Sequence, residues 1–125
     1  MKNCTDIEQS KKLIELGIDI NTADMMWDDW SLIDEGWKLS VGYYPEIEKD
    51  YGRKCYPAWS LATLLDILRN RAYSIDEDAI VTLSSYKTVE WDLSISNSGL
   101  YMVTKSDPID ACVEMIVKLK EKDLL

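Results

Sequence analysis

The sequence predicts an α+β fold: an antiparallel sheet of about five strands with three helices (N-terminal, central and C-terminal) packed mainly on one face. Apolar residues recur at helical spacing in three segments, and between these segments they alternate with polar residues at the period of a strand. The strand segments follow one another with short turns, which favours antiparallel pairing. At 125 residues, the chain has the length of one globular domain, residues 1–125.

The first helix is expected over residues 6–16. Thr5 and Glu8 have the spacing of a capping box, in which the side chain of each residue accepts a hydrogen bond from the backbone amide of the other. Isoleucine and leucine then form one stripe, and Gly17 supplies the end of the helix.

The central helix is expected over residues 60–72, where four leucines and an alanine share one face. Its start is open between Ser60 as the cap and Pro57 as the first helical residue. The C-terminal helix is expected over residues 108–122, with Asp107 as its cap and a proline at its first position. Lysines gather in its last turns, where the negative end of the helix dipole favours them.

The period of two predicts five strands, near residues 26–33, 37–44, 80–84, 88–95 and 100–105. The letters SNSG predict a turn between the last two strands, and DEG predicts a turn between the first two. Residues 45–56 are charged, match no pattern and are expected to form a loop.

The first hairpin contains the segment MMWDDWSLIDEGW, residues 25–37, which holds three of the five tryptophans and four carboxylates. Matching apolar residues across the hairpin places Trp30 on the same face as Leu39 and Val41. Trp27 and Asp29 then point to the opposite face.

Trp27, Asp28 and Asp29 are the candidate protein contact, because tryptophan is enriched among the residues that dominate protein interfaces. The structural alternative is that the tryptophan covers a face of the sheet or packs beneath a loop. An exposed Trp27 needs a cover, and two covers are open: the loop 45–56, or a partner protein or second copy of the chain.

The residue inventory excludes many chemistries. The chain has no histidine, which removes histidine-based triads and the usual zinc sites, and no glycine-rich phosphate loop. Asp28 and Asp29 are the candidate pair for binding a divalent ion or for acid–base work. They are adjacent on a strand and therefore point to opposite faces, so their carboxylates do not converge. We expect no catalytic residues, no bound metal and no cofactor, so the protein is not expected to be an enzyme.

The three cysteines are distant from one another and lack a C-x-x-C pair, which indicates reduced thiols and a cytoplasmic protein. Cys112 lies on the apolar stripe of the last helix and is expected to be more than 90% buried. Cys55 follows Arg53 and Lys54, which is expected to lower the pKa of its thiol.

The charge is strongly negative and unevenly placed. The net charge is −9, and residues 1–36 hold nine acidic side chains against three lysines. Because an acidic surface repels phosphate backbones, we expect no nucleic-acid partner. The sequence contains no apolar run long enough to span a bilayer and no apolar leader at its start, so we expect no membrane association.

Three segments resemble a family of small, uncharacterised proteins encoded by prophages and mobile elements of gut bacteria. They are IEQSKKLIELGIDINTADM at residues 7–25, PAWSLATLLDIL at residues 57–68 and DPIDACVEMIVKLKEKDLL at residues 107–125. The resemblance implies a cytoplasmic protein of phage or mobile-element origin, and it carries no activity over to any residue.

Three classes of function follow. A non-catalytic protein-binding accessory factor, acting on an unknown protein partner or by self-association, fits the acidity and the surplus of tryptophan and tyrosine best. An acidic inhibitor that imitates nucleic acid and blocks a basic host or phage enzyme is the alternative. A carboxylate-metal enzyme is third.

Overall fold

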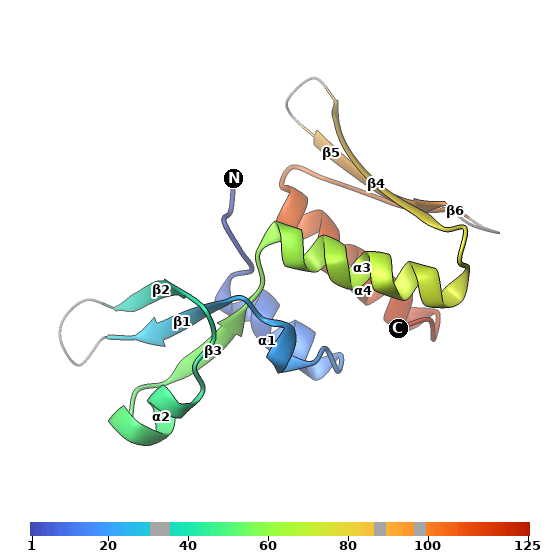
Figure 1. Ribbon diagram of the computed structural model, residues 1–125. Helices are drawn as coiled ribbons and strands as arrows, with labels where there is room; N and C mark the ends of the chain where they lie inside the picture. The colour runs from blue at the N-terminus through green and yellow to red at the C-terminus, as the bar shows by residue number, and fades with distance from the viewer. Residues whose placement is uncertain (31–35, 87–89, 97–99) are drawn as a thin grey trace. The chain divides into compact units, whose positions relative to one another are not determined.

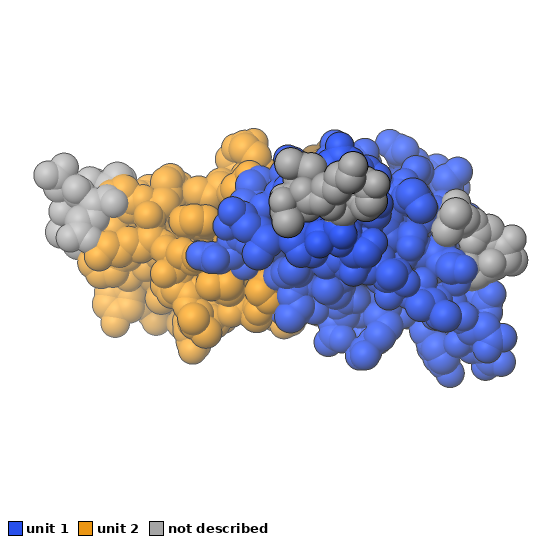
Figure 2. All heavy atoms as spheres, turned by 90° about the horizontal axis from the view of Figure 1, so that it is seen from above, with its two compact units in different colours: residues 1–3, 61–125 blue, residues 4–60 orange. Residues whose placement is uncertain are grey.

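The fold is α+β. The structure, a computed structural model, describes residues 1–30, 36–86, 90–96 and 100–125, and in this part of the chain it contains four α-helices and two three-stranded antiparallel sheets (Figure 1). These elements form two compact units: unit 2 is Cys4–Ser60, and unit 1 is Met1–Asn3 with Leu61–Leu125 (Figure 2). Whether they unfold together, as the expected single domain, stays a prediction.

The sheet of unit 2 has β1 (Met25–Asp29) in the centre, between β2 (Trp37–Val41) and β3 (Cys55–Ala58). Both neighbours pair antiparallel to β1 (Figure 1). The strands expected at 26–33 and 37–44 are therefore confirmed as a hairpin, although residues 31–33 of the first lie outside the described residues. β3 was not expected.

β3 was missed because it is four residues long and contains Pro57, which removes a backbone donor from a sheet. The Asp29 amide donates to the carbonyl of Lys54, the residue just before β3 (2.9 Å). Backbone bonds to β1 therefore come from every second residue: Lys54, Tyr56 and Ala58. Pro57 is out of phase with that series. Its nitrogen therefore points away from β1, and no ladder bond is lost.

The helices of unit 2 are α1 (Ile7–Glu15), α2 (Glu46–Tyr51) and the 3-10 turn η1 (Ile20–Thr22). α1 confirms the expected first helix. α2 lies in the segment expected to be a loop, and its last turn ends at Gly52 with a left-handed φ of 67°. At six residues it is too short to display an apolar stripe.

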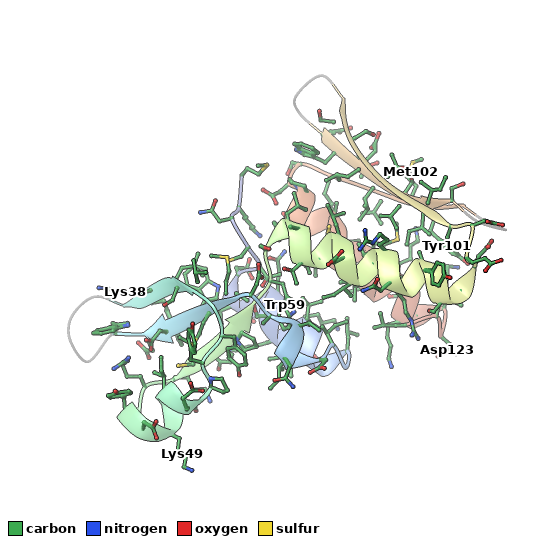
Figure 3. The ribbon with its side chains drawn as sticks, in the orientation of Figure 1. Lys38, Lys49, Trp59, Tyr101, Met102 and Asp123 are labelled. Atoms are coloured by element: carbon green, nitrogen blue, oxygen red, sulfur yellow. The ribbon has the colours of Figure 1, made fainter. Side chains whose placement is uncertain are left out.

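The cap of α1 is Asp6 and not Thr5, which corrects the expected capping box. The Gln9 amide donates to Asp6, and the Gln9 side chain accepts from the Asp6 amide. Thr5 is unavailable as a cap because its hydroxyl is buried against the Ser10 hydroxyl (2.8 Å) and accepts the Trp59 amide (3.1 Å). Trp59, labelled in Figure 3, follows β3 and is 0% exposed. Its indole N–H donates to the Thr22 hydroxyl.

Unit 1 contains α3 (Leu61–Ile75), β4 (Ile80–Tyr86), β5 (Glu90–Ser96), β6 (Leu100–Lys105) and α4 (Pro108–Glu121). The strand order is β4-β5-β6, and α3 and α4 pack together on one face of this sheet (Figure 1). The central and C-terminal helices are confirmed, with Ser60 directly before α3 and Asp107 capping α4. Residues 88–89 and the SNSG turn lie largely outside the described part.

The single sheet of about five strands is wrong. β1 and β2 complete their sheet with β3, while β4, β5 and β6 form a second one. The unrecognised β3 occupies the side of β1 that the expected sheet needed for a further neighbour. The α+β class and the antiparallel pairing are confirmed.

Candidate functional site

Trp27 lies on the opposite face of the hairpin from the one expected. It pairs directly with Leu39, so it shares a face with Leu39, Val41 and Trp37. The Trp30 amide donates to the Gly36 carbonyl (2.6 Å), which fixes the register one residue away from the expected match. A shift of one residue moves every side chain of a strand to its other face.

Part of the cover over Trp27 comes from a segment that was not considered, the residues that precede α1. Its indole N–H donates to the carbonyl of Thr5 (2.9 Å), in the segment that precedes α1. On the same face, Trp27 pairs with Tyr56 of β3, and Lys11 of α1 lies 5.2 Å from the centroid of the Tyr56 ring. Trp27 is half-buried. Its predicted role in contacting a partner stays a prediction.

Asp28 is 3% exposed and lies on the other face of the sheet. Arg53 binds its carboxylate with two parallel hydrogen bonds, from Nε to Oδ1 and from Nη2 to Oδ2, each 3.1 Å long. The indole N–H of Trp30 donates to Oδ2 as well (3.0 Å). These donors give the buried carboxylate the partners that it requires.

The Arg53 hydrogen bonds hold the pKa of Asp28 below its usual value, against the opposing effect of burial. Arg53 also stacks on two rings, with its guanidinium carbon 4.3 Å from the centroid of Trp30 and 5.2 Å from that of Tyr51. Lys38 lies over the same Trp30 ring at 5.0 Å. Asp28 is therefore the buried centre of this cluster, and its carboxylate already has its partners.

Asp29 points to the same face as Trp27 and Trp37, as strand alternation requires. It is half-buried, and its amide donates to the Lys54 carbonyl. The structure thus separates the three candidate residues: Trp27 and Asp29 share one face of the sheet, and Asp28 is buried on the other.

The expected lowering of the Cys55 pKa is wrong. Burial raises the pKa of this thiol to about 11, and the nearby Asp28 carboxylate adds to the effect. Arg53 acts in the opposite direction and is outweighed, because its charge is already matched by Asp28. Cys4 and Cys112 are free and buried as well, with pKa values raised by burial to about 11 and about 12. The expected burial of Cys112 is confirmed at 0% exposure.

The outer edge of β2 is a feature that the sequence did not reveal. Hydrogen bonds from Trp30 to Gly36 and from Gly42 to Asp24 show that the even-numbered residues of β2 direct their backbone groups toward β1. Trp37, Leu39 and Val41 therefore direct their N–H and C=O groups away from the sheet. We call these three residues the β2 edge.

The β2 edge is apolar and accessible. Its three side chains share one face of the sheet, Val41 is 81% exposed and Trp37 is 39% exposed. Within the described residues, β2 is the outermost strand on its side of the sheet, and Lys38 lies on it near the hairpin end (Figures 1 and 3). The alternation of apolar residues was visible in the sequence, but the position at an edge depends on β3, which was not.

Within the described residues, no group of three or more cysteine, aspartate or glutamate side chains is placed to hold a metal ion. The helices in this part of the chain are all too short or too polar to cross a membrane. Comparisons of the chain with protein-family models, curated proteins and solved structures find no match.

Proposed function

We propose that this protein is a non-catalytic protein-binding factor that takes an extended segment of its partner along the β2 edge. The observation that carries the proposal is the set of outward-facing backbone groups at Trp37, Leu39 and Val41. A strand edge of this kind is a template for another strand. In strand addition, main-chain hydrogen bonds provide affinity, and alternate side chains provide specificity.

The side chains of the β2 edge support this mode of binding. Trp37 lies 5.7 Å from the ring of Tyr56, so it is held in place on one side while the other remains accessible. A fixed aromatic ring contributes contact area at low entropic cost and is typical of interface hot spots. Native sheets usually protect such an edge with charges or proline, and β2 has only Lys38.

The nucleic-acid-mimicking alternative gains no support from four of the acidic residues of unit 2. Asp6 and Asp19 cap α1 and η1, Asp24 accepts from the amide and hydroxyl of Ser60, and Asp28 is bound by Arg53. An inhibitor of that kind requires carboxylates arrayed on one accessible surface, whereas these four serve the fold.

The non-catalytic part of the proposal is supported by the thiols and by Asp28. The three cysteine thiols have raised pKa values, so they are poorly suited to act as nucleophiles. The Asp28 carboxylate has a lowered pKa and is bound by Arg53, so it is poorly suited to acid–base catalysis. The three free cysteines support our proposal of a cytoplasmic location. A phage or mobile-element origin is proposed on resemblance alone.

The proposal is tested with extended peptides selected against the whole protein from a random peptide library. Bound peptide is expected to protect the amides of Trp37, Leu39 and Val41 from hydrogen exchange. The amides of Lys38 and Ser40 already bond β1 and serve as internal references. Peptides that bind without protecting the three outward amides, or a library that yields no binder, would count against the proposal.

Val41→Pro provides the matched variant. It removes the outward amide of an exposed residue without removing a bond to β1. Val41→Thr keeps the amide and the branched shape, and is the control. Peptide affinity is expected to fall in the proline variant and to remain within a few-fold in the threonine variant.

A further inference from the structure

We infer that the β2 edge pairs with a second copy of this chain, forming a symmetric dimer in which two β2 strands run antiparallel about a two-fold axis at Leu39. The inference rests on the proposed role of the β2 edge in binding. It assigns one particular occupant to that edge. The resulting sheet has six strands, because each copy contributes β3, β1 and β2.

The backbone of β2 matches itself in this arrangement. The axis at Leu39 places Trp37 opposite the partner's Val41 and Leu39 opposite the partner's Leu39. All three residues direct their amides and carbonyls outward, so each of the three facing pairs exchanges two bonds, about six in all. No other register lets all three outward residues of both copies find partners.

The side chains match themselves as well. The three edge residues lie on one face of the sheet, so the two copies form a continuous apolar stripe across the junction. The most exposed member, Val41, meets the large ring of Trp37, and aromatic with β-branched pairs are among the favourable cross-strand combinations. Both side chains thereby leave water.

Charge along the strand favours a second copy. Residues 37–44 contain no carboxylate, although the chain has a net charge of −9, and Lys38 is the one charged residue among them. In the two-fold register, Lys38 lies beside the partner's Ser40, so no like charges face one another directly. Its ammonium already lies over the Trp30 ring of its own chain.

The other edge of the same sheet is protected against such pairing. On β3, Pro57 directs a nitrogen without hydrogen to the outer side, as the register with β1 requires. Just past β3, the carbonyl of Trp59 accepts the amide of Thr5, and Cys4 forms a bridge with Ser60. Proline and covering segments are the devices by which natural sheets close an edge. β2 has neither among its described neighbours.

The dimer is expected to be weak and to strengthen with salt. Three residues from each copy bury an area at the low end of known interfaces. Each copy carries a net charge of −9, so the two repel one another until salt screens the charge, and the screening length falls from about 10 Å at 0.1 M to about 3 Å at 1 M. By contrast, an acidic partner attracted by the charge of Lys38 would bind more weakly as the salt concentration rises.

The test is analytical ultracentrifugation of the full chain over a range of protein concentrations, in 0.1 M and 1 M salt. We expect a reversible monomer–dimer equilibrium that shifts toward dimer at high salt. Val41→Pro removes two of the inter-strand bonds and is expected to raise the dissociation constant about tenfold or more. Val41→Thr is expected to change it by less.

A charge pair tests the register. In the two-fold arrangement, position 41 of one copy faces position 37 of the other. A mixture of Val41→Glu and Trp37→Lys chains is therefore expected to associate more tightly than either variant alone. A general loss of stability in either variant does not produce this gain on mixing.

Three outcomes overturn the inference: a chain that stays monomeric at both salt concentrations, a dimer that survives Val41→Pro unchanged, and no gain on mixing the charged variants. The proposed function is judged separately by the peptide experiment. If the chain is monomeric while selected peptides still protect the amides of the β2 edge, the second copy is the wrong occupant and the edge remains a binding site. If peptides also fail, both proposals fail.

Discussion

The two three-stranded sheets are held by different kinds of interior. The buried face of β4-β5-β6 is apolar, with Leu93, Ile95 and Val103 covered by the helices of unit 1. The sheet of unit 2 has short strands, and its interior includes a charged residue. Among the described residues, the buried polar side chains are Thr5, Ser10 and Asp28, all in unit 2.

Different forces therefore specify the two sheets. Apolar burial is non-directional and tolerates substitutions that preserve volume. Buried polar groups have to be satisfied by particular partners in particular directions, and removing one partner leaves the other uncompensated. Unit 2 is therefore expected to depend on single residues far more sharply than unit 1.

The largest effect is expected for Asp28→Ala. It leaves the Arg53 guanidinium, whose side chain is 17% exposed, without its counterion, and breaking a buried pair in this way costs about 3–5 kcal/mol. Chemical denaturation of the full chain measures the loss. The matched control in unit 1 is Asp66→Ala, which breaks an exposed pair with Arg69 and is expected to cost less than about 1 kcal/mol. Equal losses for the two variants would remove the distinction between the units.

The second effect concerns the two tryptophans that share a face of the unit 2 sheet. Trp27→Ala removes a half-buried ring and its hydrogen bond to Thr5, and is expected to cost about 3 kcal/mol. Trp37→Ala, at the accessible edge, is expected to cost much less and to weaken association instead. If Trp27→Ala leaves stability unchanged but abolishes association, Trp27 belongs to the contact surface.

Some elements of the fold were predictable from the sequence and others were not. α1, α3, α4 and the strands of unit 1 were predicted within a few residues, because their apolar spacing is local and regular. α2 has six residues, fewer than two helical turns, and β3 has four residues with a proline among them. Asp6 replaced Thr5 as the helix cap because the Thr5 hydroxyl has partners at Ser10 and Trp59.

The candidate site was only partly predictable for the same reason. Trp27, Asp28 and Asp29 stood out in the sequence, but matching apolar residues across the hairpin assumes that the carboxylates remain in water. Asp28 is buried because Arg53, 25 residues later, supplies its counterion. That long-range pair allows a carboxylate on the inward side of β1, beside the buried Met26, and local spacing in the sequence does not reveal it.

A smaller loss is expected for Thr5→Val. The valine keeps the shape of the side chain but leaves the buried amide of Trp59 without its acceptor, which costs about 1–3 kcal/mol. Thr104→Val is the control in unit 1, because the Thr104 hydroxyl bonds Asp92 at an exposed position, and a change within about 0.5 kcal/mol is expected. Denaturation midpoints of the two variants give the comparison directly.

The smallest effect is a difference in acid sensitivity between the sheets. The folded pKa of Asp28 lies below its ordinary value of 3.8, so the unfolded chain takes up the proton first. The stability contributed by Asp28 is fully present above the unfolded pKa and is lost as pH falls through the folded pKa, at no more than about 1.4 kcal/mol per pH unit. The buried residues of β5, Leu93 and Ile95, have no titratable side chain.

Hydrogen-exchange protection factors of β1 and β5 amides, measured at pH 6 and pH 3, resolve this difference. Protection in β1 is expected to fall more than protection in β5 as the pH is lowered. Asp28→Asn cannot titrate at this position, so in that variant the two strands are expected to respond alike. A wild-type chain in which both strands lose protection in parallel would mean that the two units open as one, and that the buried carboxylate does not set the acid limit of its own sheet.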